Sequence, residues 1–268
     1  MPHPAYPYLY ETHLHTRQAS RCARASGAEM AEACKAYGYT GIIVTDHHWG
    51  GNCAIDRSLP WEDWVDGFCQ GYYDARQRGE TIGLDVFFGW ESGFAGTEFL
   101  IHGLSPAWMK AHPALRTELP FGRPDMEEVV ARGIAAQYQM VHEGGGMVIH
   151  AHPYREEPYI PRTRLFPDLV DGVEIVNACH SNPRSAAHND PAYDARAITY
   201  AREHGFPTTA GSDIHSTDLF GSGVAFRRRL NSGQDFCQAI LSGEEMCIRD
   251  SRRPRQCPHP RVSAQGRR

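Results

Sequence analysis

The feature that most constrains this sequence is a series of short apolar runs, each followed at once by histidine, aspartate or glutamate. Examples are residues 41–45 before Asp46, residues 86–90 before Glu91 and residues 147–149 before His150. Continuous apolar runs of this length are typical of strands that are buried on both faces of a parallel sheet. The polar residues then follow the carboxyl ends of the strands, where a parallel α/β fold assembles its functional site.

Segments with helical spacing of apolar residues separate these runs. They cover residues 27–37, 61–78, 125–142 and 192–204, and Gly38 and Gly205 stand where helices commonly end. Strand and helix alternate about seven times along the chain. The pattern predicts an α/β fold with a parallel sheet, and a barrel is the form that best accounts for the polar strand ends.

Composition argues against several functional classes. The net charge of −5 disfavours general binding to nucleic acids or membrane surfaces. The eight cysteines are scattered singly, without the spacing of a disulfide framework. The first residues lack the pattern of a signal peptide, and no apolar run is long enough to span a bilayer. We therefore expect a cytoplasmic protein without a membrane partner, for which nucleic acid could only be a substrate.

Histidines and acids gather at five of the predicted strand ends. They are His13 and His15, Asp46 and His47, Glu91, His152, and Asp213 with His215. Each has an ordinary explanation alone; for example, Asp46 could cap the next helix. Together they meet at one rim of a parallel sheet, where buried carboxylates and imidazoles need cations as partners. The sequence therefore predicts a metal site.

The order of these motifs resembles that of the polymerase-and-histidinol-phosphatase (PHP) family of metal-dependent phosphoesterases. The motifs are HLH at 13–15, TDH at 45–47, Glu91, IHGL at 101–104, HAHP at 150–153 and SDIH at 212–215. They span roughly residues 8–225 in the right order. The resemblance implies a distorted TIM-like barrel of seven strands and helices, with its metal site at the carboxyl ends of the strands.

The resemblance also implies a set of ligands for two or three divalent ions of zinc, manganese or iron. His13, His15, Glu91 and Asp213 would bind the first ion, Glu91, His102 and His152 the second, and His47 and His215 the third. Many family members have an aspartate five residues after the second histidine of HLH, but here that position is Ser20. Either Cys22 serves instead as a thiolate ligand, which suits zinc, or it is an ordinary buried cysteine and the third ion is weakly bound or absent.

Other residues near these ligands could support catalysis. His48, His150 and His180 either orient the ligands by hydrogen bonds or, for His48 and His180, donate a proton to the leaving group. His180 directly follows a predicted strand, so a third alternative for it is direct contact with the metal ions. Arg17, Arg155 and Arg184 are candidate phosphate contacts, although each could be a solvated surface residue.

The chain divides into two parts by composition. We expect residues 1–243 to form the PHP-type metallohydrolase domain. Residues 244–268 are rich in arginine and proline and poor in apolar residues, so they cannot form a core. We interpret them as a disordered or foreign extension, with a nucleic-acid-binding tail as the less favoured alternative.

The predicted function is hydrolysis of a phosphate ester by a hydroxide that bridges two metal ions, with Glu91 as the bridging carboxylate. The substrate would be a small phosphomonoester, a nucleotide or a short oligonucleotide. One alternative is a non-catalytic, regulatory metal-binding module. A metal-dependent amidohydrolase is less favoured, because such enzymes usually carry a carboxylated lysine. The only lysines are Lys35 and Lys110, and neither stands at a predicted strand end.

Overall fold

The computed structural model describes residues 4–116, 127–185, 188–218 and 221–248, and within this part of the chain nine strands form a single sheet. They are β1 (Tyr8–Leu14), β2 (Gly41–Val44), β3 (Asp85–Phe94), β4 (Thr97–His102), β5 (Met147–His150), β6 (Gly172–Asn177), β7 (Thr208–Gly211), β8 (Gly223–Phe226) and β9 (Glu245–Ile248). Their order across the sheet is β7-β6-β5-β4-β3-β2-β1-β8-β9. Residues 245–248, which the composition assigned to the tail, thus belong to the sheet, and Glu244 precedes them directly. Residues 249–268 of the predicted tail lie outside the described residues.

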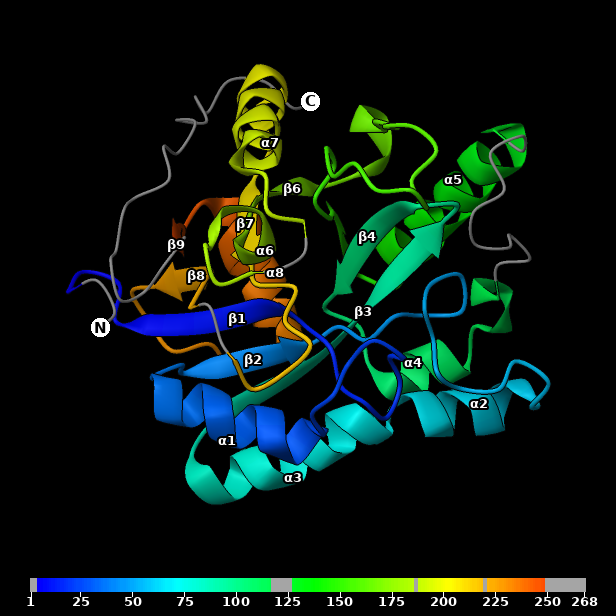
Figure 1. Ribbon diagram of the computed structural model, residues 1–268. Helices are drawn as coiled ribbons and strands as arrows, with labels where there is room; N and C mark the ends of the chain where they lie inside the picture. The colour runs from blue at the N-terminus through cyan, green and yellow to red at the C-terminus, as the bar shows by residue number, and fades with distance from the viewer. Residues whose placement is uncertain (1–3, 117–126, 186–187, 219–220, 249–268) are drawn as a thin grey trace.

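The sheet curls until its two ends almost meet (Figure 1). Pairing is parallel from β1 to β3 and from β5 to β7, whereas β4 is antiparallel to both of its neighbours and β8 is antiparallel to β1 and β9. Leu14 bridges Ile214, just after β7, and the Thr12 hydroxyl donates a hydrogen bond of 2.9 Å to the Ala210 carbonyl. The predicted distorted TIM-like barrel is confirmed, with the β3–β4 hairpin interrupting the strand–helix alternation.

Eight α-helices lie in the described part of the chain. They are α1 (Gly27–Tyr37), α2 (Trp61–Phe68), α3 (Gln70–Ile82), α4 (Pro106–Lys110), α5 (Glu127–Glu143), α6 (Ala178–Ser181), α7 (Pro191–His204) and α8 (Gly233–Ser242). The predicted helix at residues 61–78 is divided at Cys69 into α2 and α3. The predicted start of α5 lies outside the described residues. None of the described helices is long and apolar enough to cross a membrane.

Local sequence explains where the helices begin and end. Ser26 and Glu29 form a capping box at the start of α1, and Gly38 ends that helix with a φ of 111°, which glycine adopts without strain. Asp190 caps α7, whose first residue is Pro191. These signals account for the agreement between the predicted and observed limits of α1 and α7.

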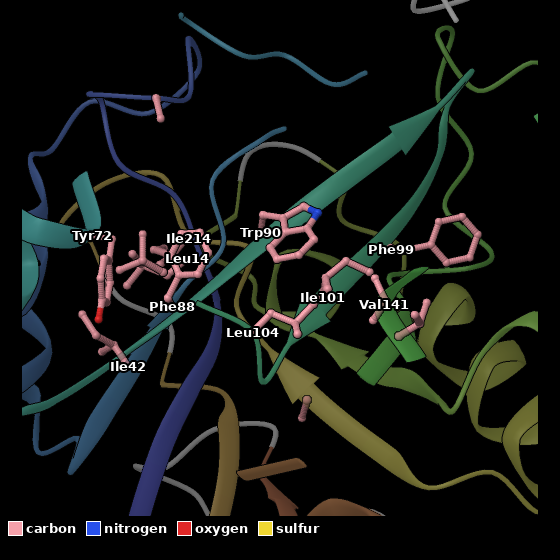
Figure 2. Close-up of a cluster of buried hydrophobic side chains, with 14 of the residues drawn as sticks. Leu14, Ile42, Tyr72, Phe88, Trp90, Phe99, Ile101, Leu104, Val141 and Ile214 are labelled. Atoms are coloured by element: carbon pink, nitrogen blue, oxygen red, sulfur yellow. The ribbon is translucent and has the colours of Figure 1, made fainter. Parts of the chain in front are cut away.

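Two apolar layers hold the barrel together. The inner layer fills the barrel below the site and includes Tyr10, Ile43 and Phe226. The outer layer lies between the strands and the surrounding helices. Figure 2 shows part of the outer layer, where Phe88 and Trp90 of β3 lie among side chains from neighbouring elements. These layers leave the polar strand ends at one end of the barrel, which we call the rim.

The direction of β4 decides which of its residues reach the rim. Gly93 of β3 pairs with Glu98, whereas Gly89, four residues earlier, pairs with His102. Since β3 runs toward the rim, β4 runs away from it. The amino-terminal end of β4, with Glu98, therefore lies at the rim, and the end with His102 lies deeper in the barrel.

The close contact between α1 and α3 predicts a site that cannot tolerate a methyl group. A Cβ atom at Gly27 would lie 2.7 Å from the Ala75 backbone nitrogen and closer still to the Gly71 carbonyl oxygen. We expect Gly27→Ala to lower the free energy of unfolding by about 1–3 kcal/mol, because the two helix backbones would have to separate. Urea denaturation measures this change.

Gly67→Ala is the matched control, because it also adds one methyl group to a helix. There the nearest atom to the added Cβ would be Ile55 Cγ2 at 3.4 Å, an ordinary contact. This variant should be as stable as the parent or gain up to about 1 kcal/mol from the better helix propensity of alanine. Equal destabilisation by both substitutions would contradict the proposed close contact.

Candidate metal centre

The two histidines of the HLH motif reach the rim from the end of β1, where its register against β2 is irregular. There the Glu11 carboxylate accepts hydrogen bonds from the backbone N–H groups of His13 (3.0 Å) and Ser212 (2.9 Å). This buried carboxylate ties the end of β1 to the segment that follows β7. As a result, His13 and His15 lie beside Asp213.

Three carboxylates surround the His13 ring. Its Nε2 atom lies 3.1 Å from Glu91 Oε1 and 3.4 Å from Asp213 Oδ1, and its Nδ1 atom lies 2.9 Å from Glu174 Oε1. All four side chains are buried. Burial alone would lower the pKa of His13, but the three carboxylates outweigh it and raise the pKa well above its usual value. The surroundings of this ring therefore strongly favour a positive charge.

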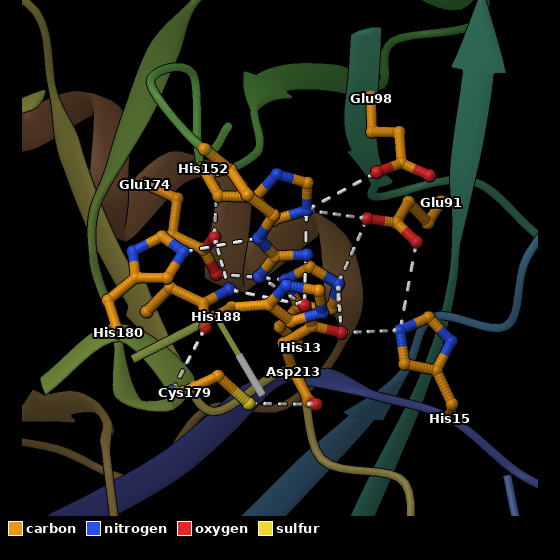
Figure 3. A network of polar contacts seen from close by, with 12 residues as sticks. His13, His15, Glu91, Glu98, His152, Glu174, Cys179, His180, His188 and Asp213 are labelled. Carbon is orange, nitrogen blue, oxygen red and sulfur yellow. Dashed lines mark hydrogen bonds and ion pairs between the residues drawn. The ribbon is translucent and has the colours of Figure 1, made fainter. Parts of the chain in front are cut away.

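Glu91 lies between two sets of histidines. Its Oε1 atom is 3.1 Å from both His13 Nε2 and His152 Nε2, whereas its Oε2 atom is 2.6 Å from His47 Nδ1. Burial would raise the pKa of Glu91, but the charges of His13 and His47 hold it well below its usual value. Figure 3 shows this carboxylate between His152 and His15. Its two oxygens face different imidazoles, which is an arrangement suited to a carboxylate that bridges two ions.

His15, His47 and His215 form a second group of rings. The centroid of the His15 ring is 4.2 Å from that of His47 and 4.3 Å from that of His215. Cys22 borders this group. Burial raises the pKa of its thiol, but hydrogen bonds with His215 and His47 outweigh this effect and lower the pKa to about 6. The structure thus places Cys22 beside the histidines to which the resemblance assigns the third ion.

Ser20, which stands where the resemblance leads us to expect an aspartate, supports the loop that carries His47. Its hydroxyl donates to Asp46 Oδ1 at 2.6 Å and accepts from the His47 backbone N–H at 3.0 Å. The Thr16 backbone N–H and hydroxyl also donate to Asp46, at 2.6 Å each. Asp46 is therefore occupied by hydrogen bonds within the loop, and Ser20 acts as a structural residue.

The donor atoms at the rim fit divalent metal ions. Four groups of three residues each offer ligand atoms that lie within 4.8 Å of one another. The groups are His15, His47 and His215; His13, His15 and Asp213; His13, His152 and Glu174; and His47, Glu91 and Glu98. His13 Nε2, His47 Nδ1 and Glu91 Oε2 are buried and lie close to groups of opposite charge, but none of them has hydrogen-bond geometry with a described residue. Mixed nitrogen and oxygen donors of this kind suit zinc, manganese and iron.

His152 and Asp213 hold strained backbone conformations, with φ angles of 28° and 52°. Outside glycine, such a conformation costs on the order of 1–3 kcal/mol and persists only where its surroundings enforce it. The His152 backbone N–H donates to Glu174 Oε2 at 3.1 Å, and Arg155 Nη2 donates to Asp213 Oδ2 at 2.6 Å. Strain of this kind concentrates at functional sites.

His102, which the resemblance assigned to the second ion, is not brought to this cluster. It belongs to none of the four groups, and its ring lies 5.1 Å from that of Phe236 in the inner apolar layer. Burial lowers its pKa to about 3. The reason is the antiparallel direction of β4, which points the residue away from the rim.

His48 and His150 are buried among aromatic side chains. The His48 ring packs edge-on against Trp64 and Phe68, at centroid distances of 5.1 and 5.6 Å, and the His150 ring stacks on Phe99 at 5.0 Å. Burial lowers the pKa of each histidine to about 3. The proton-donor role predicted for His48 does not fit this apolar environment.

One of the three predicted phosphate contacts lies at the rim. Arg155 is 4% exposed and bonds to Asp213. Arg17 and Arg184 are exposed, and they pair with Glu29 (2.9 Å) and Asp218 (2.8 Å). Their surroundings are those of solvated surface residues, which was the alternative interpretation.

His180 lies at the edge of the ligand cluster. Its ring is nearly perpendicular to that of His152, at a centroid distance of 6.4 Å. Its two nitrogens contact Asp194 and Arg155, at 2.9 and 3.1 Å. Burial lowers the pKa of His180, and the positive charge of Arg155 adds to this effect.

Two acids at the rim were missed in the sequence. Glu174 lies in the middle of β6, between Val173 and Ile175, and Glu98 lies near the start of β4. A charged residue inside an otherwise apolar, buried strand needs a partner, and this signal could have identified Glu174. Glu98 could be placed only once the antiparallel direction of β4 was known.

An open cavity of about 500 Å³ adjoins the rim and is lined by residues of the loop after β5, including Arg155, Pro158 and Ile160. A smaller pocket shares Arg155 and Ile160 with it and reaches Glu98 and His152. The buried guanidinium thus lies between the metal-ligand cluster and a space that can accept a ligand.

Comparison with known proteins gives one partial family match and several solved structures of similar fold. A family model described as PHP-associated (PHP_C) matches residues 193–245. One similar structure is a two-domain protein from Bacteroides vulgatus that contains a predicted PHP-like metal-dependent phosphoesterase. It is 15% identical, the match covers 93% of this chain and 67% of the Bacteroides chain, and the TM-score is 0.58. A protein from Bifidobacterium adolescentis, assigned as a metal-dependent phosphoesterase, is 16% identical over 87% of this chain and 95% of its own, with a TM-score of 0.52.

An amidohydrolase from Chromobacterium violaceum, solved with bound sulfate and no metal, is 16% identical over 77% of this chain and 87% of its own, with a TM-score of 0.49. No curated protein matches the sequence. At these identities the two structures with the higher TM-scores establish a shared fold.

The environment of Glu98 predicts a pH-dependent stability. Burial and the nearby charge of Glu91 raise the pKa of Glu98 to about 8, from an ordinary value of 4.5. Between these pH values the folded, metal-free chain retains a proton that the unfolded chain releases. Its stability should therefore fall as pH rises through this window, by up to about 1.4 kcal/mol per pH unit.

Glu98→Gln should remove this part of the pH dependence. Urea denaturation in the presence of a chelator, at pH 5 to 8, measures it as the difference between the parent and the variant. Glu62→Gln, on the exposed side of α2, is the matched control and should leave the slope unchanged. Identical slopes for the parent and Glu98→Gln would contradict the prediction.

Proposed function

We propose that this chain hydrolyses phosphate esters with two or three divalent metal ions. Its fold and its carboxyl-terminal family match are those of PHP-type proteins. The observation that carries the proposal is the cluster of five histidines and four carboxylates at the rim, whose donor atoms face one another at ligand spacing. All nine side chains are buried except His215, which is partly exposed. Cations can balance these buried carboxylates and use the unpaired lone pairs of the imidazoles.

We assign the ligands from the geometry together with the resemblance. His13, His15 and Asp213 would hold one ion, and His152 with Glu174 or Glu98 would contribute to a second. His15, His47 and His215 face a third position, bordered by Cys22. Glu91 is the proposed bridge, because its two oxygens face different histidines. His102 is not part of this set.

The chain's own residues would position the substrate. When bound, the divalent ions would generate a nucleophile from water and neutralise the phosphoryl oxygens. Arg155 carries a permanent charge at the junction between the ligand cluster and the cavity, so its guanidinium can donate to a phosphoryl oxygen. Glu91 would fix the separation between the two ions that it joins. The proposed substrate is a small phosphomonoester, a nucleotide or a short oligonucleotide. We also propose that the protein acts in the cytoplasm.

The amidohydrolase alternative has less support. Lys35 donates to the Gly83 carbonyl and Lys110 pairs with Asp66, both on exposed surfaces. Neither lysine can therefore serve as a carboxylated bridging ligand at the rim. A non-catalytic metal-binding module remains the main competing function, and a direct assay distinguishes the two.

The proposed function predicts that Asp213→Ala abolishes phosphate-ester hydrolysis. A chromogenic phosphate ester is assayed with added zinc, manganese or iron, and bound metal is measured on the same samples. Turnover should fall by more than about 100-fold, since loss of even an outer-shell partner of a metal ligand costs roughly 10- to 100-fold. Asp66→Ala, which removes an exposed carboxylate, should keep both metal and activity. Bound metal without turnover in the parent would favour the non-catalytic module, and the absence of both would overturn the proposal.

A second prediction concerns Cys22. If its thiolate binds the third ion beside His47 and His215, the cobalt-loaded protein will show a sulfur-to-cobalt charge-transfer band in the near ultraviolet. Cys22→Ser should abolish this band, whereas Cys53→Ala should preserve it, because Cys53 is buried in the outer apolar layer. A band that persists in Cys22→Ser would show that this thiolate is not a ligand.

A further inference from the structure

Arg155 is a buried cation whose guanidinium donates hydrogen bonds to Asp213 and His180 and also contacts the Tyr159 hydroxyl. Nη2 donates to Asp213 Oδ2 at 2.6 Å, and Nε donates to His180 Nε2 at 3.1 Å. The residue follows His152 by three positions, and its backbone N–H donates to the His152 carbonyl at 3.0 Å. The guanidinium is thus held against a proposed metal ligand on one side and against His180 on the other.

These contacts determine which nitrogen of His180 carries the proton. A guanidinium remains protonated in proteins, so Arg155 Nε can only donate and His180 Nε2 must accept. The ring proton therefore belongs on Nδ1, which lies 2.9 Å from Asp194 Oδ1. Because a carboxylate accepts hydrogen bonds, Asp194 stabilises this neutral tautomer.

Asp194 is well placed for this role. It lies on α7, and its side chain is buried. The Asn177 backbone N–H also donates to Asp194 Oδ1, at 3.2 Å, and so ties the carboxylate to the end of β6. The Tyr193 ring packs perpendicular to the His180 ring at a centroid distance of 5.1 Å. The imidazole therefore has a restricted orientation between α7 and the rim, and Figure 3 shows it beside the ligand cluster.

We propose that Asp194 and His180 form a positioning pair that holds the Arg155 guanidinium toward Asp213 and the adjoining cavity. In this role His180 orients a substrate-binding group and does not protonate the leaving group, since its one proton points to Asp194. The inference rests on the proposed phosphoesterase function, in which Arg155 contacts the phosphoryl group.

Two substitutions separate positioning from general structural support. In Asp194→Asn, the amide can donate to His180 Nδ1 and so favour the tautomer that is protonated on Nε2. That proton would oppose Arg155 Nε–H and displace the guanidinium. In His180→Gln, the side-chain oxygen can still accept from Arg155, whereas His180→Leu offers no acceptor.

The experiment combines a spectroscopic and a kinetic measurement on the zinc-loaded full chain. Long-range ¹H–¹⁵N spectra of protein labelled in its histidines report the protonation of each ring nitrogen, and the His180 signals are identified by their loss in His180→Gln. We expect His180 to be neutral and protonated on Nδ1 in the parent. An Nε2-protonated or doubly protonated His180 in the parent would overturn the proposal without the need for any stable variant.

In the kinetic measurement, Asp194→Asn and His180→Leu should lower kcat/KM for a phosphate ester by roughly 10- to 100-fold, at unchanged zinc content. A rise in KM should account for most of this loss, and His180→Gln should recover most of the activity. Equal losses in His180→Gln and His180→Leu, with zinc content and thermal stability unchanged, would overturn the positioning role.

Failure of the inference and failure of the proposed function give different results. If the parent does not hydrolyse phosphate esters, the proposed function fails, whereas the tautomer of His180 is still measured. Binding of inorganic phosphate to the zinc-loaded protein then replaces the kinetic readout. It should weaken in Asp194→Asn and His180→Leu, and equal affinity in the parent and both variants would count against the pair.

Discussion

The desolvation of a few carboxylates governs the arrangement at the rim. Glu91, Glu174 and Asp213 are buried, and each is balanced by an imidazole or a guanidinium within about 3 Å. Removing one partner would leave an uncompensated charge in a water-poor environment, which is far costlier than losing an exposed ion pair. The surrounding strands and loops therefore have little freedom to move independently, and the positions of the histidines follow from those of the acids.

Much of the fold could be predicted from the sequence because its signals are local. Apolar runs and helical spacing indicate the α/β barrel, and caps such as Ser26 and Gly38 mark the ends of a helix. The convergence of His13, Glu91 and Asp213 follows from parallel strands that share a direction. Among the described residues, these positions lie together as the motifs indicate.

The remaining features depend on contacts that are distant in sequence or on strand direction. A hairpin reverses β4, so Glu98 and His102 exchange the positions that a parallel strand would give them. Asp194 belongs to a helix whose spacing gives no sign that one carboxylate is buried against His180. Ser20 departs from the motif pattern that the sequence otherwise resembles, but its hydrogen bonds to the Asp46 loop depend on the three-dimensional structure.

The left-handed backbone conformations of His152 and Asp213 lower the stability of the fold, while their side chains are proposed to be needed for activity. Glycine at either position would relieve the backbone strain and would at the same time delete a proposed ligand. A search for more heat-resistant versions of this protein would therefore tend to replace the residues that its chemistry needs most. Retention of these two side chains would then reflect selection for function at the expense of the stability of the folded state.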